Sequence, residues 1–134
     1  MPRTLLLDPG AAWRQIVDRL VHPGKPNGSW FFILGALRFL RRHLRTERYD
    51  AVLSTSPDLA AHRIASEVSV RYGIPWVADS RDDFATIRRK PAVFLKLEKR
   101  YLEPAAAFTT VSHGVAEALE ERLGRPVSVI ENGF

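Results

Sequence analysis

The sequence predicts an α/β fold in which helices flank a mostly parallel sheet, in three layers, α/β/α. Two observations lead to this prediction. From residue 51 onward, short apolar segments alternate with longer segments whose apolar residues recur at helical spacing. Small, polar or charged residues follow each short apolar segment. Strands and helices in alternation are typical of a parallel sheet whose faces are covered by right-handed crossover helices.

Before residue 51, the sequence predicts one strand and two helices. Thr4 to Leu7 form the strand, which the turn signal at residues 8–10 ends. A weak helix follows over residues 11–20, and then a loop rich in proline and glycine. Ser29 has the side chain of an N-cap, and a strong helix runs from there to about Thr46. Its apolar stripe consists of Trp30, Ile33, Leu34, Leu37, Leu40 and Leu44.

The middle of the chain gives a strand, a helix and a second strand. Residues 51–53 form the first strand, after which Ser56 caps a helix with Pro57 at its first position. Gly73 ends this helix. Residues 76–78 form the next strand, which the charged run 79–83 closes. The buried stripe of the helix consists of Ala61, Ile64, Ala65, Val68 and Tyr72.

The last third of the chain repeats this alternation. A helix begins near Pro91 and ends at residues 103–104, and residues 108–111 form a strand. Ser112 caps the final helix, which Gly124 ends, and residues 127–130 form the last strand. The apolar faces of the two helices consist of Phe94, Leu97 and Tyr101 in the first, and Val115, Leu119 and Leu123 in the second.

Composition restricts the functional classes. The chain of 134 residues fits a single domain, and the absence of cysteine excludes disulfides and cysteine-ligated zinc. A net charge of +5 favours anionic partners, but no motif that reads DNA or RNA accompanies it, so nucleic acid ranks last. No apolar run approaches the roughly 20 residues of a membrane-spanning helix, and no signal peptide is evident. We therefore expect a cytoplasmic protein.

Polar residues follow each strand from residue 51 onward. In an open parallel sheet, ligands bind beside the carboxyl ends of the strands, so we expect these residues to gather at one edge. The alternative is that serine and aspartate are simply the usual residues of strand-to-helix turns. Free N–H groups at the helices after Ser56 and Ser112 would attract phosphate. The candidate binding residues are Ser56, Asp79, Arg81, Asp82, Ser112 and His113, and Asn132 and Gly133 follow the last strand at the same edge.

The charged run 79–83 allows three chemical interpretations. Its three aspartates and one arginine could hold sugar hydroxyls, act as a base, or bind a divalent cation. The metal interpretation is the weakest, since no second acidic cluster lies nearby in sequence and the four histidines lack ligand spacing. We therefore expect no metal site.

Three segments, in this order and spacing, resemble glycosyltransferase family 4. They are Tyr-Asp-Ala-Val-Leu-Ser-Thr-Ser-Pro at residues 49–57, Tyr-Gly-Ile-Pro-Trp-Val-Ala-Asp-Ser-Arg-Asp at residues 72–82, and Thr-Val-Ser at residues 110–112 followed by Val-Ile-Glu-Asn-Gly-Phe at residues 129–134. The form of the second segment is similar to a subgroup that acts in surface-polysaccharide assembly. The resemblance extends from Tyr49 to Phe134.

The resemblance implies a GT-B enzyme, in which two Rossmann-like domains face each other across a cleft. The N-terminal domain binds the acceptor and the C-terminal domain binds a nucleotide-sugar, and transfer retains the anomeric configuration without a metal. This chain would then be a partial N-terminal, Rossmann-like domain. Arg81 and Asp82 would face the acceptor, and Asn132 and Gly133 would lie at the interdomain junction. The nucleotide-sugar is expected only in the complete enzyme, and no other cofactor is expected.

The sequence departs from the family pattern in four respects. The first strand with its glycine-rich loop and the donor domain with its paired glutamates are not found. Arg81 or a neighbour occupies the place of a frequent histidine, and Glu131 replaces the usual proline. We therefore expect no catalysis by this chain alone. The alternatives are a standalone sugar- or phosphate-binding module, or a subunit that pairs with a separate donor-domain chain. An uncovered sheet edge and uncovered apolar faces also predict self-association.

The segment from Trp30 to Arg48 combines aromatic residues with a cluster of arginines. A basic amphipathic helix suits the anionic surface of a membrane, and family members often act on lipid-linked acceptors at the cytoplasmic face. The alternative is an ordinary packed helix with a solvated end. Phe31, Phe32 and Phe39 widen the apolar surface, which predicts contact with a membrane or with another protein segment.

Overall fold

The computed structural model describes residues 4–7, 30–56, 59–83 and 92–133. The predicted weak helix 11–20, the loop that follows it, the Ser29 cap and the positions of Pro57 and Pro91 lie outside these residues. Within them, the predicted alternation of strands and helices is confirmed, and the chain forms a Rossmann-like α/β fold.

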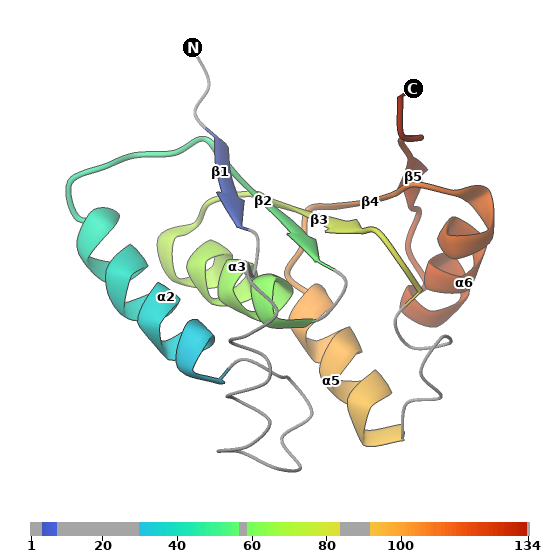
Figure 1. The fold of residues 1–134 in the computed structure, drawn as a ribbon, viewed down its shortest axis with the longest axis horizontal. Coiled ribbons are helices and arrows are strands. Elements are labelled where there is room, and N and C mark those ends of the chain that lie inside the picture. The colour runs from blue at the N-terminus through green and yellow to red at the C-terminus, as the bar shows by residue number, and fades with distance from the viewer. Residues whose placement is uncertain (1–3, 8–29, 57–58, 84–91, 134) are drawn as a thin grey trace.

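Five parallel strands form one sheet, in the order β1-β2-β3-β4-β5 (Figure 1). Every strand predicted from the sequence is present among them. The second and third strands run further than predicted, because Thr55, Asp79 and Ser80 continue the ladder between β2 and β3. The strands are β1 (Thr4–Leu7), β2 (Ala51–Ser56), β3 (Trp76–Ser80), β4 (Ala107–Thr110) and β5 (Ser128–Val129).

The described helices lie on the same side of this sheet (Figure 1). A chain that places each strand beside the previous one through right-handed crossovers puts every connecting helix on one face. The described residues therefore form two layers, and a second helical layer is not found among them. The helices are α2 (Trp30–His43), α3 (Leu59–Tyr72), α5 (Ala92–Leu102) and α6 (His113–Leu123).

The core lies between the helices and one face of the sheet. Val52, Trp76, Ala78 and Phe108 are buried on this face, where they pack with apolar side chains of α2, α3 and α6. The residues that alternate with them in β2 and β3 are only partly buried, because they point to the opposite face. Leu37, Leu40, Ile64, Val68, Ala116 and Leu119 supply the helical half of the core.

The helix α2 ends earlier than predicted, and its buried face is narrower than the predicted apolar stripe. It ends at His43, and Thr46 lies in the turn that follows. Ile33 and Leu40 are buried as expected, but Leu34 is 49% exposed. The contact with α3 is therefore narrower than the predicted stripe.

Helix boundaries agree with the prediction at the three caps that the described residues allow us to compare. Gly73 and Gly124 end α3 and α6 with positive φ angles of 66° and 67°. Ser112 caps α6, and its Oγ accepts a hydrogen bond from the Val115 amide at 3.4 Å. The predicted cap at Ser56 lies at the last residue of β2, and residues 57–58, which separate it from α3, are outside the described residues.

Candidate functional site

The carboxyl ends of four strands align along one edge of the sheet. Ser56, Ser80, Thr110 and Val129 are successive register partners across β2 to β5. Because the strands are parallel, the segments that follow them all leave from this edge. The predicted gathering of strand ends is therefore present, and it defines the candidate site.

Arg81 connects two of these segments. Its Nη2 donates a hydrogen bond to Asn132 Oδ1, so the residue after β3 reaches the segment after β5. Its Nη1 lies 3.9 Å from Asp79 Oδ2, and 47% of the Arg81 side chain remains exposed. A partly exposed guanidinium held in this way can bind phosphate, carboxylate or sugar oxygens through its remaining N–H groups.

Asp79 lies inside β3 rather than in the turn that follows it. Its Oδ2 accepts a hydrogen bond from Thr55 Oγ1 and its Oδ1 accepts one from Thr109 Oγ1, each at 2.8 Å. The three residues are register partners on β2, β3 and β4, and they lie on the sheet face opposite the helices. Asp79 is therefore fixed by its neighbours, and 15% of its side chain is exposed.

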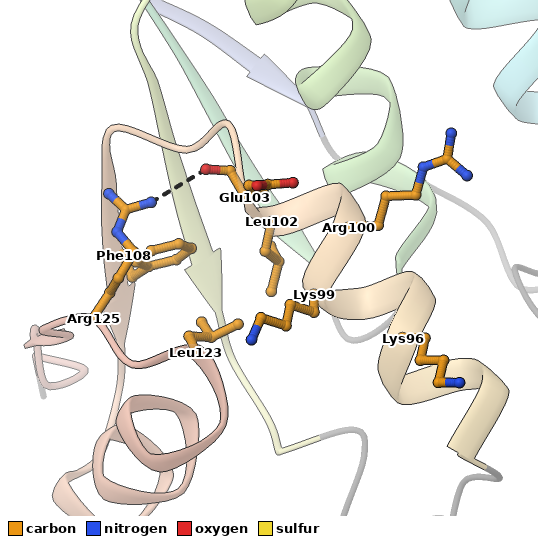
Figure 2. Close-up of a pocket in the computed structure, with 8 residues that line it drawn as sticks. All are labelled: Lys96, Lys99, Arg100, Leu102, Glu103, Phe108, Leu123 and Arg125. Carbon is orange, nitrogen blue, oxygen red and sulfur yellow. Dashed lines mark hydrogen bonds between the residues drawn. The ribbon is translucent and has the colours of Figure 1, made fainter.

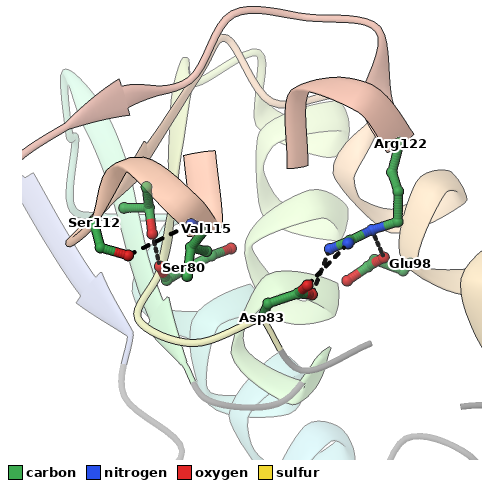
Figure 3. A network of polar contacts seen from close by, with 7 residues as sticks. Ser80, Asp83, Glu98, Ser112, Val115 and Arg122 are labelled. Carbon is green, nitrogen blue, oxygen red and sulfur yellow. Dashed lines mark hydrogen bonds and ion pairs between the residues drawn. The ribbon is translucent and has the colours of Figure 1, made fainter. Parts of the chain in front are cut away.

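Asp83 has a structural environment that the sequence did not indicate. Its carboxylate accepts two hydrogen bonds from Arg122 of α6, at 2.7 and 3.2 Å (Figure 3). Arg122 Nε lies 3.4 Å from Glu98 Oε2 of α5, an ion-pair distance. Burial raises the pKa of Glu98, with Arg122 acting in the opposite direction and Asp83 in the same direction.

The three aspartates of the charged run consequently do not converge on one ligand. Asp79 is held within the sheet, Asp83 pairs with Arg122 of α6, and Asp82 is exposed at the edge. In the described part of the chain, no group of three acidic or histidine side chains could hold a metal ion.

The remaining candidate site residues lie either at a helix cap or at exposed positions near the carboxyl ends of the strands. Ser112 uses its hydroxyl as the N-cap of α6, and His113 is exposed in the first turn of that helix. Asn132 and Gly133 are exposed beyond β5. The backbone of Ser56 ends β2 at the same edge, but its side chain is outside the described set.

The sequence matches the family model of Glycosyltransferase Family 4 over residues 4–134. The chain belongs to glycosyltransferase family 4. Membership indicates a glycosyltransferase-like role in general. No curated protein matches the sequence. In this glycosyltransferase family 4 chain, the exposed edge therefore presents a cation, a carboxylate, an imidazole and an amide, from Arg81, Asp82, His113 and Asn132.

Proposed function

We propose that this chain is the acceptor-binding part of a retaining glycosyltransferase. The complete enzyme would transfer a sugar from a nucleotide-sugar to a glycan or lipid-linked acceptor in surface-polysaccharide synthesis. The observation that carries the proposal is the hydrogen bond between Arg81 and Asn132 at the carboxyl edge of the sheet. It joins two of the segments that bear the family resemblance, and it leaves half of the arginine side chain accessible to a ligand.

In this proposal Arg81 and Asp82 contact the acceptor, and Asn132 and Gly133 adjoin the donor domain. The donor nucleotide binds to that other domain, so the isolated chain transfers no sugar. Hydroxyl and phosphate oxygens of the acceptor accept hydrogen bonds from the guanidinium, while the Asp82 carboxylate accepts from hydroxyls. No step of the proposal requires a metal or another cofactor.

The test is an assay of the product of the whole coding frame that contains this segment. Labelled nucleotide-sugars are supplied with a membrane lipid extract, and labelled lipid is measured. Arg81→Ala is expected to lower kcat/KM by about tenfold to a hundredfold, because it removes a charge-assisted hydrogen bond. Arg71→Ala, at an exposed position at the end of α3, is the control and is expected to leave activity unchanged.

The outcomes separate this proposal from its alternative. Transfer that depends on Arg81 supports the enzyme. A product that transfers no sugar from any nucleotide donor, yet binds a sugar or phosphate through Arg81, contradicts the enzyme and supports the binding module or the paired subunit.

We further propose that α2 contacts an anionic membrane surface on the cytoplasmic side. Phe31 is 55% exposed and Phe39 is 62% exposed on this helix. Arg38, Arg42 and Arg45 line a shallow groove beside Leu34 and Leu37. Exposed apolar residues beside arginines suit the boundary between lipid head groups and acyl chains. In the described ranges, no helix has the length and hydropathy to cross a bilayer.

Co-sedimentation with phosphatidylglycerol vesicles tests this contact. Binding is expected at low salt and should weaken as salt is added. Arg42→Gln is expected to lower the affinity for vesicles about fivefold, because each basic residue near the lipid surface contributes roughly 1 kcal/mol to binding. Arg71→Gln removes an equal charge from α3 and serves as the matched control. Absence of binding at low salt, or equal losses in both variants, would contradict the role of α2.

A further inference from the structure

A pocket of about 490 Å³ opens between α5 and α6 (Figure 2). It lies toward the edge of the sheet where β4 and β5 begin, because Glu103 precedes β4 and Arg125 precedes β5. The candidate acceptor site lies at the opposite edge, where the strands end. The pocket is therefore a separate feature of the molecule.

Arg125 is held in this pocket by contacts with uncharged groups. Its Nη1 donates to the Glu103 carbonyl and its Nη2 to the Ala106 carbonyl, both at 3.3 Å. Its guanidinium carbon lies 4.7 Å from the centroid of the Phe108 ring. These contacts position the guanidinium before any ligand arrives, so a bound anion would not have to order it.

Lys99 provides a second cation on the other wall. Its side chain is exposed and extends from α5 toward Leu123 of α6 (Figure 2). Among the described residues, its ammonium has no carboxylate at ion-pair distance. Other basic residues in the described ranges do have such partners: Arg41 pairs with Glu67, and Arg122 pairs with Asp83.

The walls of the pocket are apolar between these cations. Leu102, Phe108 and Leu123 line it, so an apolar group entering it would be removed from water. Four of the lining residues are basic and one, Glu103, is acidic. The positive charge therefore favours an anion, while the walls favour a hydrophobic body.

We propose that this pocket binds an organic anion in which a phosphate or carboxylate group is attached to an apolar body. Lys99 and Arg125 pair with the anionic group, and Leu102 and Leu123 contact the body. A soluble metabolite and a membrane lipid can both supply this chemistry. Neither requires the acceptor site, so the proposal is independent of the proposed glycosyl transfer.

The site is tested by titrating the 134-residue chain with phenyl phosphate. Amide chemical shifts in NMR spectra monitor the binding. The shifts are expected to concentrate at residues 99–103 and 123–125. Inorganic phosphate lacks the apolar body and benzyl alcohol lacks the charge, so each should bind at least about tenfold more weakly. Lys99→Gln is expected to weaken phenyl phosphate binding about tenfold, the effect of one charge-assisted hydrogen bond.

Two further variants keep the test decisive. Arg71→Gln removes one positive charge from the end of α3, outside the pocket, and should leave the affinity unchanged. Leu123→Trp should fill the pocket and block binding while every cation remains. Shifts centred elsewhere, or equal affinities in Lys99→Gln and Arg71→Gln, would overturn the proposal.

Vesicles of phosphatidate in phosphatidylcholine distinguish the two sources. If a lipid is the ligand, Lys99→Gln should lower vesicle binding more than Arg71→Gln does. If the ligand is soluble, the two variants should lower vesicle binding equally, while only Lys99→Gln weakens phenyl phosphate binding.

Discussion

His62 is a polar side chain in the middle of the core. It is 2% exposed, and its Nδ1 shares a hydrogen bond of 2.8 Å with Ser54 Oγ. The same hydroxyl oxygen accepts a hydrogen bond of 2.7 Å from Trp76 Nε1. Burial lowers the pKa of His62 from 6.5 to about 4, although the Asp79 carboxylate raises it. The imidazole is therefore neutral in the folded protein at neutral pH.

This lowered pKa predicts a loss of stability in mild acid. Below pH 6.5 the unfolded chain binds a proton at His62, whereas the folded chain binds it only near pH 4. The free energy of unfolding should therefore fall as the pH decreases from 6.5 to 4, by roughly 3 kcal/mol at most. Urea denaturation at several pH values measures this slope.

The control is His62→Gln, whose side chain does not titrate. At pH 7 this variant should be less stable by about 1 kcal/mol, because the hydrogen bond is altered. Its free energy of unfolding should change less between pH 6.5 and 4 than that of the parent protein. An unchanged slope in the variant would contradict the assignment to His62.

At the scale of single residues, the sequence predicted where polar groups gather but not what each one contacts. Arg81 and Asn132 were expected at one edge because each follows a strand, and they meet there. The partnership of Asp79 with Thr55 and Thr109 was not predicted, because it depends on strand register. The sequence does contain a threonine near the end of each neighbouring strand. These threonines indicate partners of Asp79 only when the register of the strands is known.

At the scale of elements, local chemistry predicted most strands and helices. Apolar runs located the strands, and glycine and serine marked helix ends. The ends of β2 and β3 were placed too early because Thr55 and Asp79 are polar and were assigned to turns. Their side chains hydrogen-bond to each other across the sheet, so tertiary pairing outweighs the weak strand propensity of Asp79.

The cap of α6 gives a prediction with a matched control. Gly124 has a φ of 67° and open space around its Cα, so Gly124→Ala should destabilise the protein through backbone strain alone, by about 1 kcal/mol. Gly35 lies within α2, also with open space, and Gly35→Ala should stabilise by about 0.5–1 kcal/mol. Thermal unfolding of both variants measures the two effects, and shifts of the same sign would contradict them.

At the scale of the whole molecule, Arg122 joins three parts of the chain. It links α6 to Asp83 in the segment after β3 and to Glu98 in α5 (Figure 3). Arg122→Gln should destabilise the protein by about 3 kcal/mol, because it leaves two largely buried carboxylates without their cation. Chemical denaturation measures this loss.

Glu98→Gln provides the second arm of this experiment. Because the pKa of Glu98 is raised, its charged form costs stability that increases as the pH rises through that pKa. Adding Glu98→Gln to Arg122→Gln should therefore recover about 1–2 kcal/mol, most clearly at high pH. If the losses in free energy of unfolding of the two single variants add up to the loss of the double variant, the two side chains do not interact.

The sheet face opposite the described helices gives a prediction about association. Leu53 and Val77 are partly exposed there, beside Asp79 and its threonine partners. If the chain self-associates through this face, Val77→Lys should lower the mass measured by light scattering at high concentration, because a buried ammonium opposes the contact. Val70→Lys, at a position 69% exposed on α3, is the control. A chain that is monomeric at every concentration would refute self-association.

The order of the strands also has a consequence for how the protein is made. Each described strand from β2 onward pairs with the strand that precedes it in the chain. A chain leaving the ribosome therefore finds the partner for each new strand already synthesised, and no pairing has to wait for a later segment. Each loop closure joins strands that are consecutive in the chain, which keeps its entropic cost small. Folding can thus advance vectorially from β1 to β5 during translation.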